Sequence, residues 1–241
     1  MGGCALTSRP IIEIEDLRVV YPDGRVAVDG VSLRIESGSS VALLGANGAG
    51  KSSLLLALVG ILPASGHIRV GGVPLSSSTL AEIRRSVQLV FQDPNDQLFM
   101  PVLRDDIAFG PLNFGVPADE ATGLVSRSLS AVGLEGFEDR NPHNLSVGER
   151  TRAALAAALA CAPDVLLLDE PSAALDPRGR RQLVQLLSGL DATKVIATHD
   201  LLFAEETCDS AVLMAGGRIV AVGPTKSLLS DSDLLREQGL L

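Results

Sequence analysis

The sequence predicts an α/β fold with a mostly parallel sheet, an added antiparallel β layer and an inserted α-helical subdomain. Three observations lead to this prediction. After residue 40, short apolar runs alternate with helical patterns, as in a parallel sheet covered by helices on both faces. Near the N-terminus, polar and apolar residues alternate around turn residues, which is typical of β-hairpins. Residues 92–144 are irregular and rich in Pro, Asn, Asp and Gly, which indicates an insertion.

The N-terminal part of the chain is expected to form strands and one buried helix. Residues 11–36 alternate apolar and polar side chains on either side of the turn sequence "PDG". "SVALLG", residues 40–45, has the apolar run of a buried parallel strand. "KSSLLLALVGIL", residues 51–62, predicts a buried helix that a proline closes, and "HIRVGGVPL", residues 67–75, predicts another hairpin.

The middle of the chain holds the expected insertion. Thr79 and Glu82 have the spacing of a capping box for a helix with the sequence "LAEIRRS". "VQLVF" follows it as a strand. We place a helical subdomain at residues 93–160, and its last helix is expected over residues 149–161.

The C-terminal part repeats the alternation of strand and helix. "DVLLLDE", residues 164–170, and "KVIATHD", residues 194–200, predict short buried strands. Between them, residues 180–190 place leucines at i, i+3, i+4 and i+7, which predicts an amphipathic helix. "AVLMAGGRIVAVG" predicts a hairpin that turns at its Gly-Gly pair. The length of 241 residues suits a single domain, 1–241.

Charge and hydropathy exclude several classes of function. The formal net charge is −9, which disfavours nucleic-acid partners because contacts to phosphate take a surplus of Lys and Arg. The mean hydropathy is +0.30, but Pro163 and Asp164 break the longest apolar region, residues 153–168. A transmembrane helix needs about 18 or more apolar residues. The apolar excess is therefore assigned to a buried core and to any partner-facing surface.

The cysteines and the N-terminal sequence carry no sign of export. Cys4, Cys161 and Cys208 are far apart and form no CxxC pair, which favours a reducing compartment and argues against zinc. The start "MGGCALTS" lacks an apolar stretch before Cys4, and Leu6 breaks the pattern for myristoylation.

A phosphate-binding loop is predicted between the strand at 40–45 and the helix that follows it. The sequence "GANGAGKSS" matches G-x-x-x-x-G-K-[ST]. Its glycines let backbone N–H groups point at phosphate, and the helix adds its positive N-terminal end. Lys51 would reach the β- and γ-phosphates and Ser52 would bind Mg²⁺; the alternative is a Gly-rich turn before a core helix. The predicted nucleotide-binding residues are Gly45, Ala46, Asn47, Gly48, Ala49, Gly50, Lys51, Ser52 and Ser53.

Two carboxylates end the strand at 164–170. Asp169 and Glu170 would lie at the C-terminal edge of the sheet, where ligands bind in open parallel sheets. Asp169 would hold Mg²⁺, usually through water, and Glu170 would face the attacking water as general base. The alternative is a solvated acidic turn after a core strand.

The two motifs together indicate a P-loop NTPase, and four further stretches narrow the family. Gln92 follows the strand "VQLVF", "LSVGE" precedes the long helix at 149–161, "SAALDP" follows the acidic pair, and His199 ends a strand. In this order the chain resembles the ATP-binding-cassette (ABC) ATPases over almost its full length.

The resemblance implies roles for four more residues. Tyr21 would stack on adenine, Gln92 would contact Mg²⁺ and the water, Asp176 would act across a dimer interface, and His199 would grip the γ-phosphate. Gln92 would also link the site to the inserted subdomain. Tyr21 could instead pack a hairpin, and His199 could be a strand-end histidine with a structural partner.

The resemblance also implies a dimer. In this family two cassettes close head-to-tail, and the signature loop of one covers the ATP held by the other. The usual loop is Leu-Ser-Gly-Gly-Gln; here Ser146 keeps the hydroxyl that would reach the partner's γ-phosphate. A valine is costly in such a loop only if its backbone needs a positive φ or touches the nucleotide. We therefore predict a working loop, made of Leu145, Ser146, Val147, Gly148 and Glu149.

Residues 90–115 resemble a narrower branch, the energy-coupling-factor ATPases of cobalt and nickel uptake, in which "FQDP…QLF…DIAFGPLN" follows the glutamine. A transmembrane partner would contact about residues 92–115. Four apolar residues there, Leu98, Phe99, Met100 and Val102, would form that surface or belong to the core of the insertion. That branch usually carries a longer C-terminal extension that holds the dimer together. Residues 224–241 leave room for one helix, so we expect closure driven by ATP and not a constitutive dimer.

The sequence therefore predicts the ATP-hydrolysing subunit of a membrane importer, at the cytoplasmic face of the cell membrane. Its cofactors would be ATP and Mg²⁺, and its cargo a transition-metal ion such as cobalt or nickel, or a vitamin. One alternative is a soluble ABC-type ATPase that acts on DNA or ribosomes, although this chain has one cassette and no long insert. Another is a regulatory module that binds ATP without turnover, which rests on Val147 alone.

Overall fold

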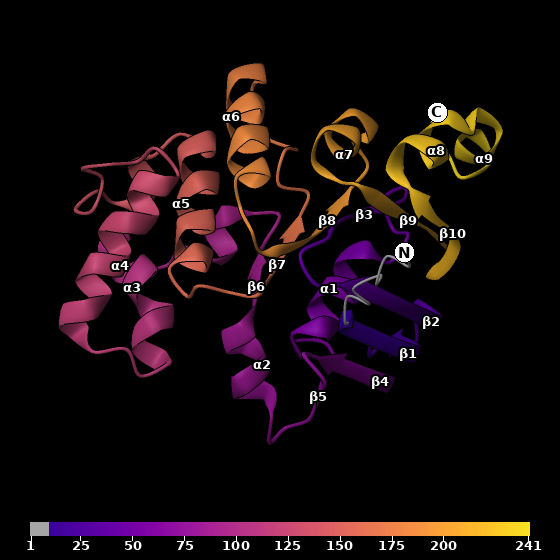
Figure 1. Ribbon diagram of the computed structural model, residues 1–241, viewed down its shortest axis with the longest axis horizontal. Coiled ribbons are helices and arrows are strands. Elements are labelled where there is room, and N and C mark those ends of the chain that lie inside the picture. The colour runs from indigo at the N-terminus through magenta and orange to yellow at the C-terminus, as the bar shows by residue number, and fades with distance from the viewer. Residues whose placement is uncertain (1–9) are drawn as a thin grey trace, which may run out of the picture.

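A six-stranded sheet runs through the centre of the protein (Figure 1). The computed structural model describes residues 10–241; Cys4, Leu6 and the rest of the N-terminal sequence motif lie outside the described residues. The strand order is β10-β9-β3-β8-β7-β6, and every neighbouring pair is parallel except β10 with β9. The predicted mostly parallel sheet is confirmed. Its strands are β3 (Ser40–Leu44), β6 (Val87–Val90), β7 (Val165–Asp169), β8 (Thr193–Thr198), β9 (Ser210–Ala215) and β10 (Arg218–Pro224).

The central strands are buried along their whole length because both faces of the sheet are covered. Every residue of β3, β7 and β8 is buried. Ala42 and Leu44 of β3 face one hydrophobic cluster, and Val41 and Leu43 face another. Continuous apolar runs are what parallel strands with two covered faces require.

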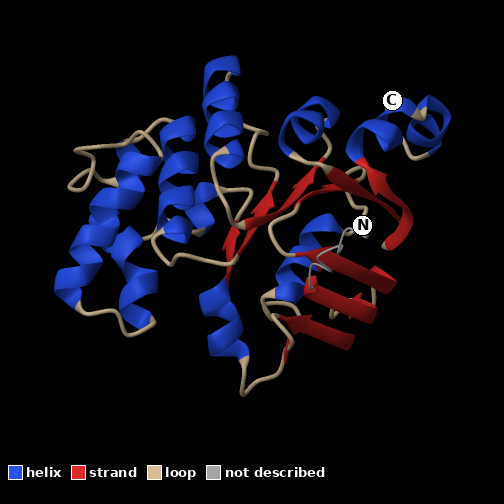
Figure 2. Ribbon diagram, in the orientation of Figure 1, coloured by secondary structure: helices blue, strands red, loops and turns tan. Residues whose placement is uncertain are grey.

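A second, antiparallel sheet covers one face of the first, as predicted (Figure 2). Its order is β2-β1-β4-β5. The alternating pattern of the N-terminal segments puts Ile12, Ile14 and Val28 in the core that this sheet shares with the central one. The strands are β1 (Pro10–Val20), β2 (Val26–Glu36), β4 (Ala64–Val70) and β5 (Val73–Pro74).

Helix α1 (Lys51–Leu58) lies between the two sheets. It contacts β7 and β8 of the central sheet and β1 and β2 of the small sheet. Contacts on opposite sides explain why its sequence is apolar all round and shows no amphipathic stripe. The helix ends at Leu58, earlier than the predicted residue 62, and Gly60 turns the chain with a φ of 64°.

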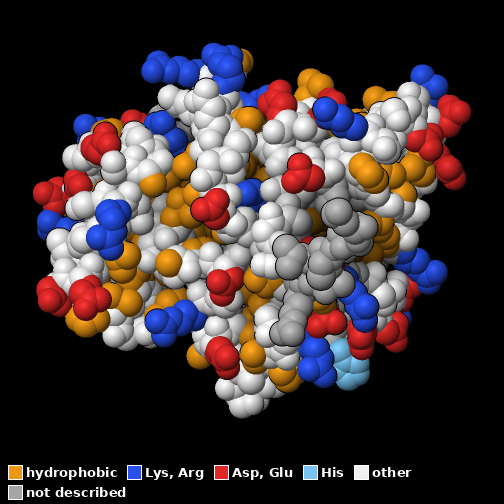
Figure 3. Space-filling model, viewed as in Figure 1, with side chains coloured by type: hydrophobic (Ala, Val, Ile, Leu, Met, Phe, Trp, Pro, Cys, Tyr) orange, Lys and Arg blue, Asp and Glu red, His pale blue; other side chains and the backbone are white. Residues whose placement is uncertain are grey.

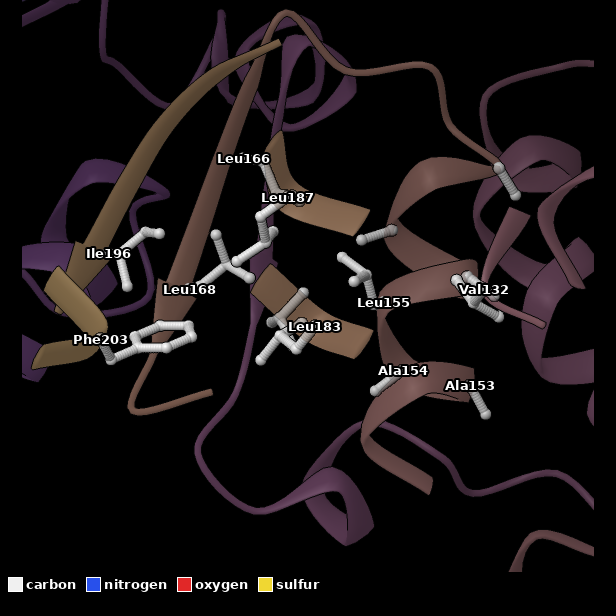
Figure 4. Close-up of a cluster of buried hydrophobic side chains, with 14 of the residues drawn as sticks. Val132, Ala153, Ala154, Leu155, Leu166, Leu168, Leu183, Leu187, Ile196 and Phe203 are labelled. Atoms are coloured by element: carbon white, nitrogen blue, oxygen red, sulfur yellow. The ribbon is translucent and has the colours of Figure 1, made fainter. Parts of the chain in front are cut away.

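The opposite face of the central sheet is covered by helices, and three of them form a separate group at the left of Figure 1. These are α3 (Leu103–Asn113), α4 (Ala118–Ala131) and α5 (Val147–Leu159), which contact one another. Figure 4 shows Leu155 of α5 pointing toward Leu183 and Leu187, which come from α6 (Pro177–Ser188). The alanines of α5 let it pack closely, so this helix shares one hydrophobic core with the sheet.

Two local predictions are wrong. Thr79 does not cap α2 (Leu80–Ser86), because its hydroxyl donates to the carbonyl oxygen of Pro74 at 2.6 Å. The C-terminal segment forms two short helices, α8 (Thr225–Ser230) and α9 (Ser232–Glu237), and not one. Asp231 separates them, since its carboxylate accepts the N–H of Leu234 and so starts α9.

The remaining elements are short. Helix α7 (Leu201–Thr207) packs against α6 and α8. The 3₁₀ turn η1 (Pro94–Asp96) precedes α3, and a second one, η2 (Pro142–Asn144), lies between α4 and α5. Within residues 10–241, no helix has both the length and the hydropathy needed to cross a membrane. Figure 3 shows acidic and basic side chains intermixed over the viewed face, without one continuous basic surface.

Candidate active site

The predicted phosphate loop connects β3 to α1 and is clamped against the small sheet. Gly48 and Gly50 have φ values of 83° and 102°, a region that residues with a side chain rarely adopt. A Cβ atom on Gly50 would lie 2.2 Å from the carbonyl oxygen of Ala27 in β2, whereas one on Gly48 would meet nothing within 4 Å. The curled backbone that would cradle phosphate is therefore fixed by contact with β2.

Lys51 is the first residue of α1 and is buried at the mouth of the loop. Its Nζ donates to the carbonyl oxygen of Gly45 at 2.7 Å and to that of Ala46 at 3.3 Å. It also lies 3.4 Å from Oε1 of Glu170. A buried ammonium group needs such partners, and a triphosphate would offer it stronger ones.

Asp169 ends β7 beside the helix start. Burial raises the pKa of its carboxyl, and the Ser52 hydroxyl, which hydrogen-bonds to it, lowers that pKa. Its Oδ1 atom is buried and has no hydrogen-bond partner in the described chain. A buried carboxylate oxygen that lacks a hydrogen-bond donor, next to the hydroxyl oxygen of Ser52, suits a hard cation such as Mg²⁺. The residues present therefore fit the predicted metal.

The carboxylate of Glu170 has three side-chain partners, Thr198, His199 and Lys51. The Thr198 hydroxyl donates to its Oε2 at 3.2 Å, and Nδ1 of His199 lies 3.0 Å from its Oε1, on the side where Lys51 also lies. The backbone of Glu170 has a φ of 44°, an uncommon value for a residue with a side chain. The backbone N–H of Glu170 donates to Ala197 of β8 at 2.8 Å, so the neighbouring strand fixes this conformation.

The structure brings most of the predicted nucleotide residues together in one pocket, but Tyr21, Gly45 and Ala46 do not line it. Residues 47–53 line it with Gln92, Glu170 and His199. Ser52 and Gln92 also line the adjoining groove that contains Asp169. Arg25, Val26 and Ala27 complete the pocket wall, and the sequence argument missed all three.

Tyr21 contacts the phosphate loop but is itself covered. Its hydroxyl lies 3.0 Å from Oγ of Ser53, and the guanidinium of Arg25 lies 4.5 Å from the centre of its ring. The position of Arg25 four residues after the only tyrosine, across a turn, was the available signal for this cation–π pair. Adenine would share the Tyr21 ring with Arg25 or displace it.

The signature loop forms the start of α5. Ser146 and Glu149 cap each other: Oγ of Ser146 donates to Oε2 of Glu149 at 2.7 Å, and the N–H of Ser146 donates to the same oxygen at 2.8 Å. These bonds lower the pKa of Glu149. Val147 is the first helical residue and has no positive φ, so the backbone of the loop tolerates its side chain.

Most of the signature loop lies outside the phosphate-loop pocket of its own chain, although Val147 lines the adjoining groove that contains Asp169. Ser146, Gly148 and Glu149 line a separate groove together with Asp176. Asp176 starts α6, and its Oδ1 accepts the N–H of Gly179 at 2.7 Å. Leu145 is buried and anchors the loop in the core.

Comparison with known proteins identifies the family. A family model described as "ABC transporter" matches residues 28–173. The chain belongs to the ABC transporter family. The predicted family and fold are therefore confirmed, and this ABC cassette binds ATP and is an ATPase coupled to transport.

Three ABC proteins show how far the similarity extends. An energy-coupling factor transporter ATP-binding protein, EcfA, of Methanocaldococcus jannaschii is 42% identical over 236 residues, 95% of this chain and 85% of that protein. The structure of cbiO1 from Clostridium perfringens, part of the ABC transporter complex cbiONQ, is 36% identical with a TM-score of 0.82, covering 95% and 94% of the two chains. The ATP-binding cassette MJ0796, solved as a dimer in a post-hydrolysis state bound to ADP and Pi, is 25% identical with a TM-score of 0.80, covering 89% and 98%.

The apolar surface predicted for a membrane partner is only partly present in the ABC cassette. Leu98 is buried in the core, where it packs with α3 and α5 residues, and Met100 and Val102 are half-buried. Phe99 is 60% exposed and meets the ring of Phe109 edge-on at 5.1 Å between centroids. Leu98 therefore belongs to the core, whereas Phe99 is exposed and its contact with a membrane partner stays a prediction.

Proposed function

We propose that this chain is the ATP-hydrolysing subunit of an energy-coupling-factor importer and works as a dimer at the cytoplasmic face of the membrane. The observation that carries the proposal is the Glu170 carboxylate, held beside His199 and Lys51 at the mouth of the phosphate loop. Its cofactors are ATP and Mg²⁺. Residues 1–241 form a single ATPase domain, in which residues 93–160 are the helical subdomain that carries the signature loop.

Nucleotide binding rests on the loop and on Lys51. The N–H groups of the loop and the N-terminus of α1 meet the phosphates, and Lys51 leaves the Gly45 carbonyl to neutralise them. Mg²⁺ supplies charge neutralisation at the phosphates, and Ser52, Asp169 and Gln92 would hold it. Arg25 and Tyr21 form the wall against which the base stacks.

Hydrolysis rests on Glu170 and His199. Glu170 accepts the proton of the attacking water at a carboxylate oxygen, a role that is typically worth about 10²–10⁴ in rate. The hydroxyl of Thr198 holds Oε2. Oε1 lies beside Nδ1 of His199 and Nζ of Lys51, and it becomes available to the water once these two groups bind phosphate. His199, whose side chain is half-exposed, holds the γ-phosphate from the pocket wall.

The second subunit supplies what the pocket lacks. Ser146 and Gly148 lie in a groove apart from the phosphate loop of the same chain, so they serve a nucleotide held by another cassette. Asp176 borders the same groove and contacts the partner when the two cassettes close. This arrangement makes hydrolysis depend on dimerisation.

The membrane partner binds beside Phe99. The ring of Phe99 contacts that of Phe109, and Phe109 lines an adjacent groove. Ile61, Leu89, Phe91 and Phe114 form much of the apolar wall of this groove. Exposed apolar patches of this kind mark interaction sites. A cytoplasmic helix of the transmembrane component fits this groove, and the resemblance over residues 90–115 favours cobalt or nickel as its cargo.

Purification from membranes tests this function against the soluble alternative. The chain, expressed with the membrane proteins encoded beside it, should be extracted in detergent as a complex whose ATPase activity depends on Mg²⁺. Recovery with nucleic acid, or without any membrane protein, would contradict the importer and favour the soluble ATPase.

A further inference from the structure

The hydroxyl hydrogen of Ser146 is engaged before any partner arrives. A serine hydroxyl has a single hydrogen, and a carboxylate can only accept it. The 2.7 Å bond from Oγ of Ser146 to Oε2 of Glu149 therefore points that hydrogen at Glu149. Oγ in turn accepts the N–H of Glu149 at 3.3 Å. As held, the hydroxyl presents electron pairs and not a hydrogen to the solvent side.

A phosphate needs the opposite orientation. The oxygens of a γ-phosphate are acceptors, so Ser146 can bind one only by donating its hydrogen. That hydrogen must first leave Glu149, and a hydrogen bond to a charged group is stronger than one between neutral groups. The carboxylate is also an acceptor in the groove where the partner's ATP would arrive.

Glu149 has no stronger partner that would draw it away from Ser146. Arg152 and Arg140 are the positive groups near it. Arg152 donates to the side chain of Gln182 at 3.1 Å, and Arg140 lies over the ring of Phe137 at 3.8 Å. In the described part of the chain, Glu149 forms no ion pair within 4.0 Å.

We propose that Glu149 is a positioning residue that holds the Ser146 hydroxyl in a non-donating orientation and thereby raises the ATP concentration at which two subunits close. The proposal rests on the function proposed above, in which Ser146 contacts the partner's nucleotide. A glutamine at this position would keep the cap, because capping boxes accept Glu or Gln at this site. Its amide is neutral, and its NH₂ group can donate to Oγ, which leaves the serine hydrogen free for phosphate.

The test compares Glu149→Gln with a matched control, Glu120→Gln, which removes the same charge from an exposed first turn of α4. Both are made together with Glu170→Gln so that ATP persists, and dimerisation is followed by light scattering as ATP is added. Glu149→Gln should lower the half-maximal ATP concentration about tenfold, and Glu120→Gln should leave it unchanged. In otherwise wild-type protein, Glu149→Gln should lower KM for ATP by a larger factor than it changes kcat, and Glu120→Gln should change neither.

Ser146→Ala separates the possible outcomes. It should raise the ATP concentration needed for closure, and Glu149→Gln should then have no further effect. If Glu149→Gln still promotes closure in the Ser146→Ala protein, Glu149 acts by charge alone and the proposal is overturned. If Ser146→Ala impairs closure while Glu149→Gln equals Glu120→Gln, the inference fails and the proposed function stands. If Ser146→Ala has no effect on closure, both fail.

Discussion

Gly50→Ala should damage the phosphate loop far more than Gly48→Ala, although both glycines have positive φ values in the same loop. The left-handed region costs an ordinary L-residue roughly 1–2 kcal/mol, and both variants incur this term. Only the Gly50 variant adds a Cβ atom that would lie 2.2 Å from the Ala27 carbonyl oxygen. The backbone shift that relieves such a clash destabilises the folded state by roughly a further 1–3 kcal/mol. We expect a loss of about 1–2 kcal/mol for Gly48→Ala and about 2–5 kcal/mol for Gly50→Ala.

Urea denaturation without nucleotide measures both losses, because no phosphate is then present to meet the added methyl groups. The difference between the two variants isolates the contact between the loop and β2. ATP binding should be weakened at least tenfold in Gly50→Ala, since the loop must move away from Ala27. Equal losses of stability in the two variants would refute the clamp between the phosphate loop and the small sheet.

Three further predictions concern the exposed ring of Phe99, the buried carboxyl of Asp106 and the guanidinium of Arg25. Phe99→Ala should abolish co-purification with the membrane partner, while the ATPase activity of the free chain stays within about twofold of the wild type. Val222 is also exposed but lies on β10, and Val222→Ala should leave the complex intact. Loss of co-purification in both variants would contradict a specific role for Phe99. Asp106 is a buried residue of α3 whose carboxylate accepts the N–H groups of Phe99 and Met100. Burial raises the pKa of this carboxyl, so its folded value lies above the unfolded value of 3.8 and the folded state keeps the proton to higher pH. The free energy of unfolding of the wild type, relative to Asp106→Asn, should therefore fall as pH rises from 3.8 through that raised pKa, and denaturation curves across this range without such a fall would contradict the assignment. Arg25→Ala should raise KM for ATP several-fold more than Arg25→Lys does, because a cation beside Tyr21 borders the pocket; equal KM values for all three proteins would exclude Arg25 from nucleotide binding.

The parts of the site that could be predicted are those in which neighbouring residues act together. Residues 45–53 hold the glycines and the lysine directly after a buried apolar run, so the position of the loop between a strand and a helix follows from the sequence alone. The contact of Gly50 with Ala27, which fixes the backbone of the loop, does not. The same holds for Asp169 and Glu170 at the end of a buried apolar run. Order along the chain then placed Gln92 and His199, which the fold brings into the same pocket.

The parts that could not be predicted depend on competition between contacts. Thr79 has the spacing of a cap, but its hydroxyl donates to Pro74 in the preceding turn, so spacing alone was misleading. Leu98 and Phe99 are adjacent and similarly apolar, yet one is buried and the other is exposed, because a short irregular stretch has no periodicity to assign faces. Arg25 and Tyr21 meet only through the geometry of the turn between β1 and β2.

The central claim is that Glu170 is the base of an ATPase whose pocket is otherwise built for binding. Glutamine at this position keeps an oxygen for the Thr198 hydroxyl and has the same shape, so the pocket should persist. Steady-state ATPase measurements with Mg²⁺, together with equilibrium binding of ATP, test the claim directly, with Glu120→Gln as the charge control. The account predicts that Glu170→Gln lowers kcat by about 10²–10⁴ and leaves the Kd for ATP within about threefold. Hydrolysis by Glu170→Gln at the wild-type rate would contradict it.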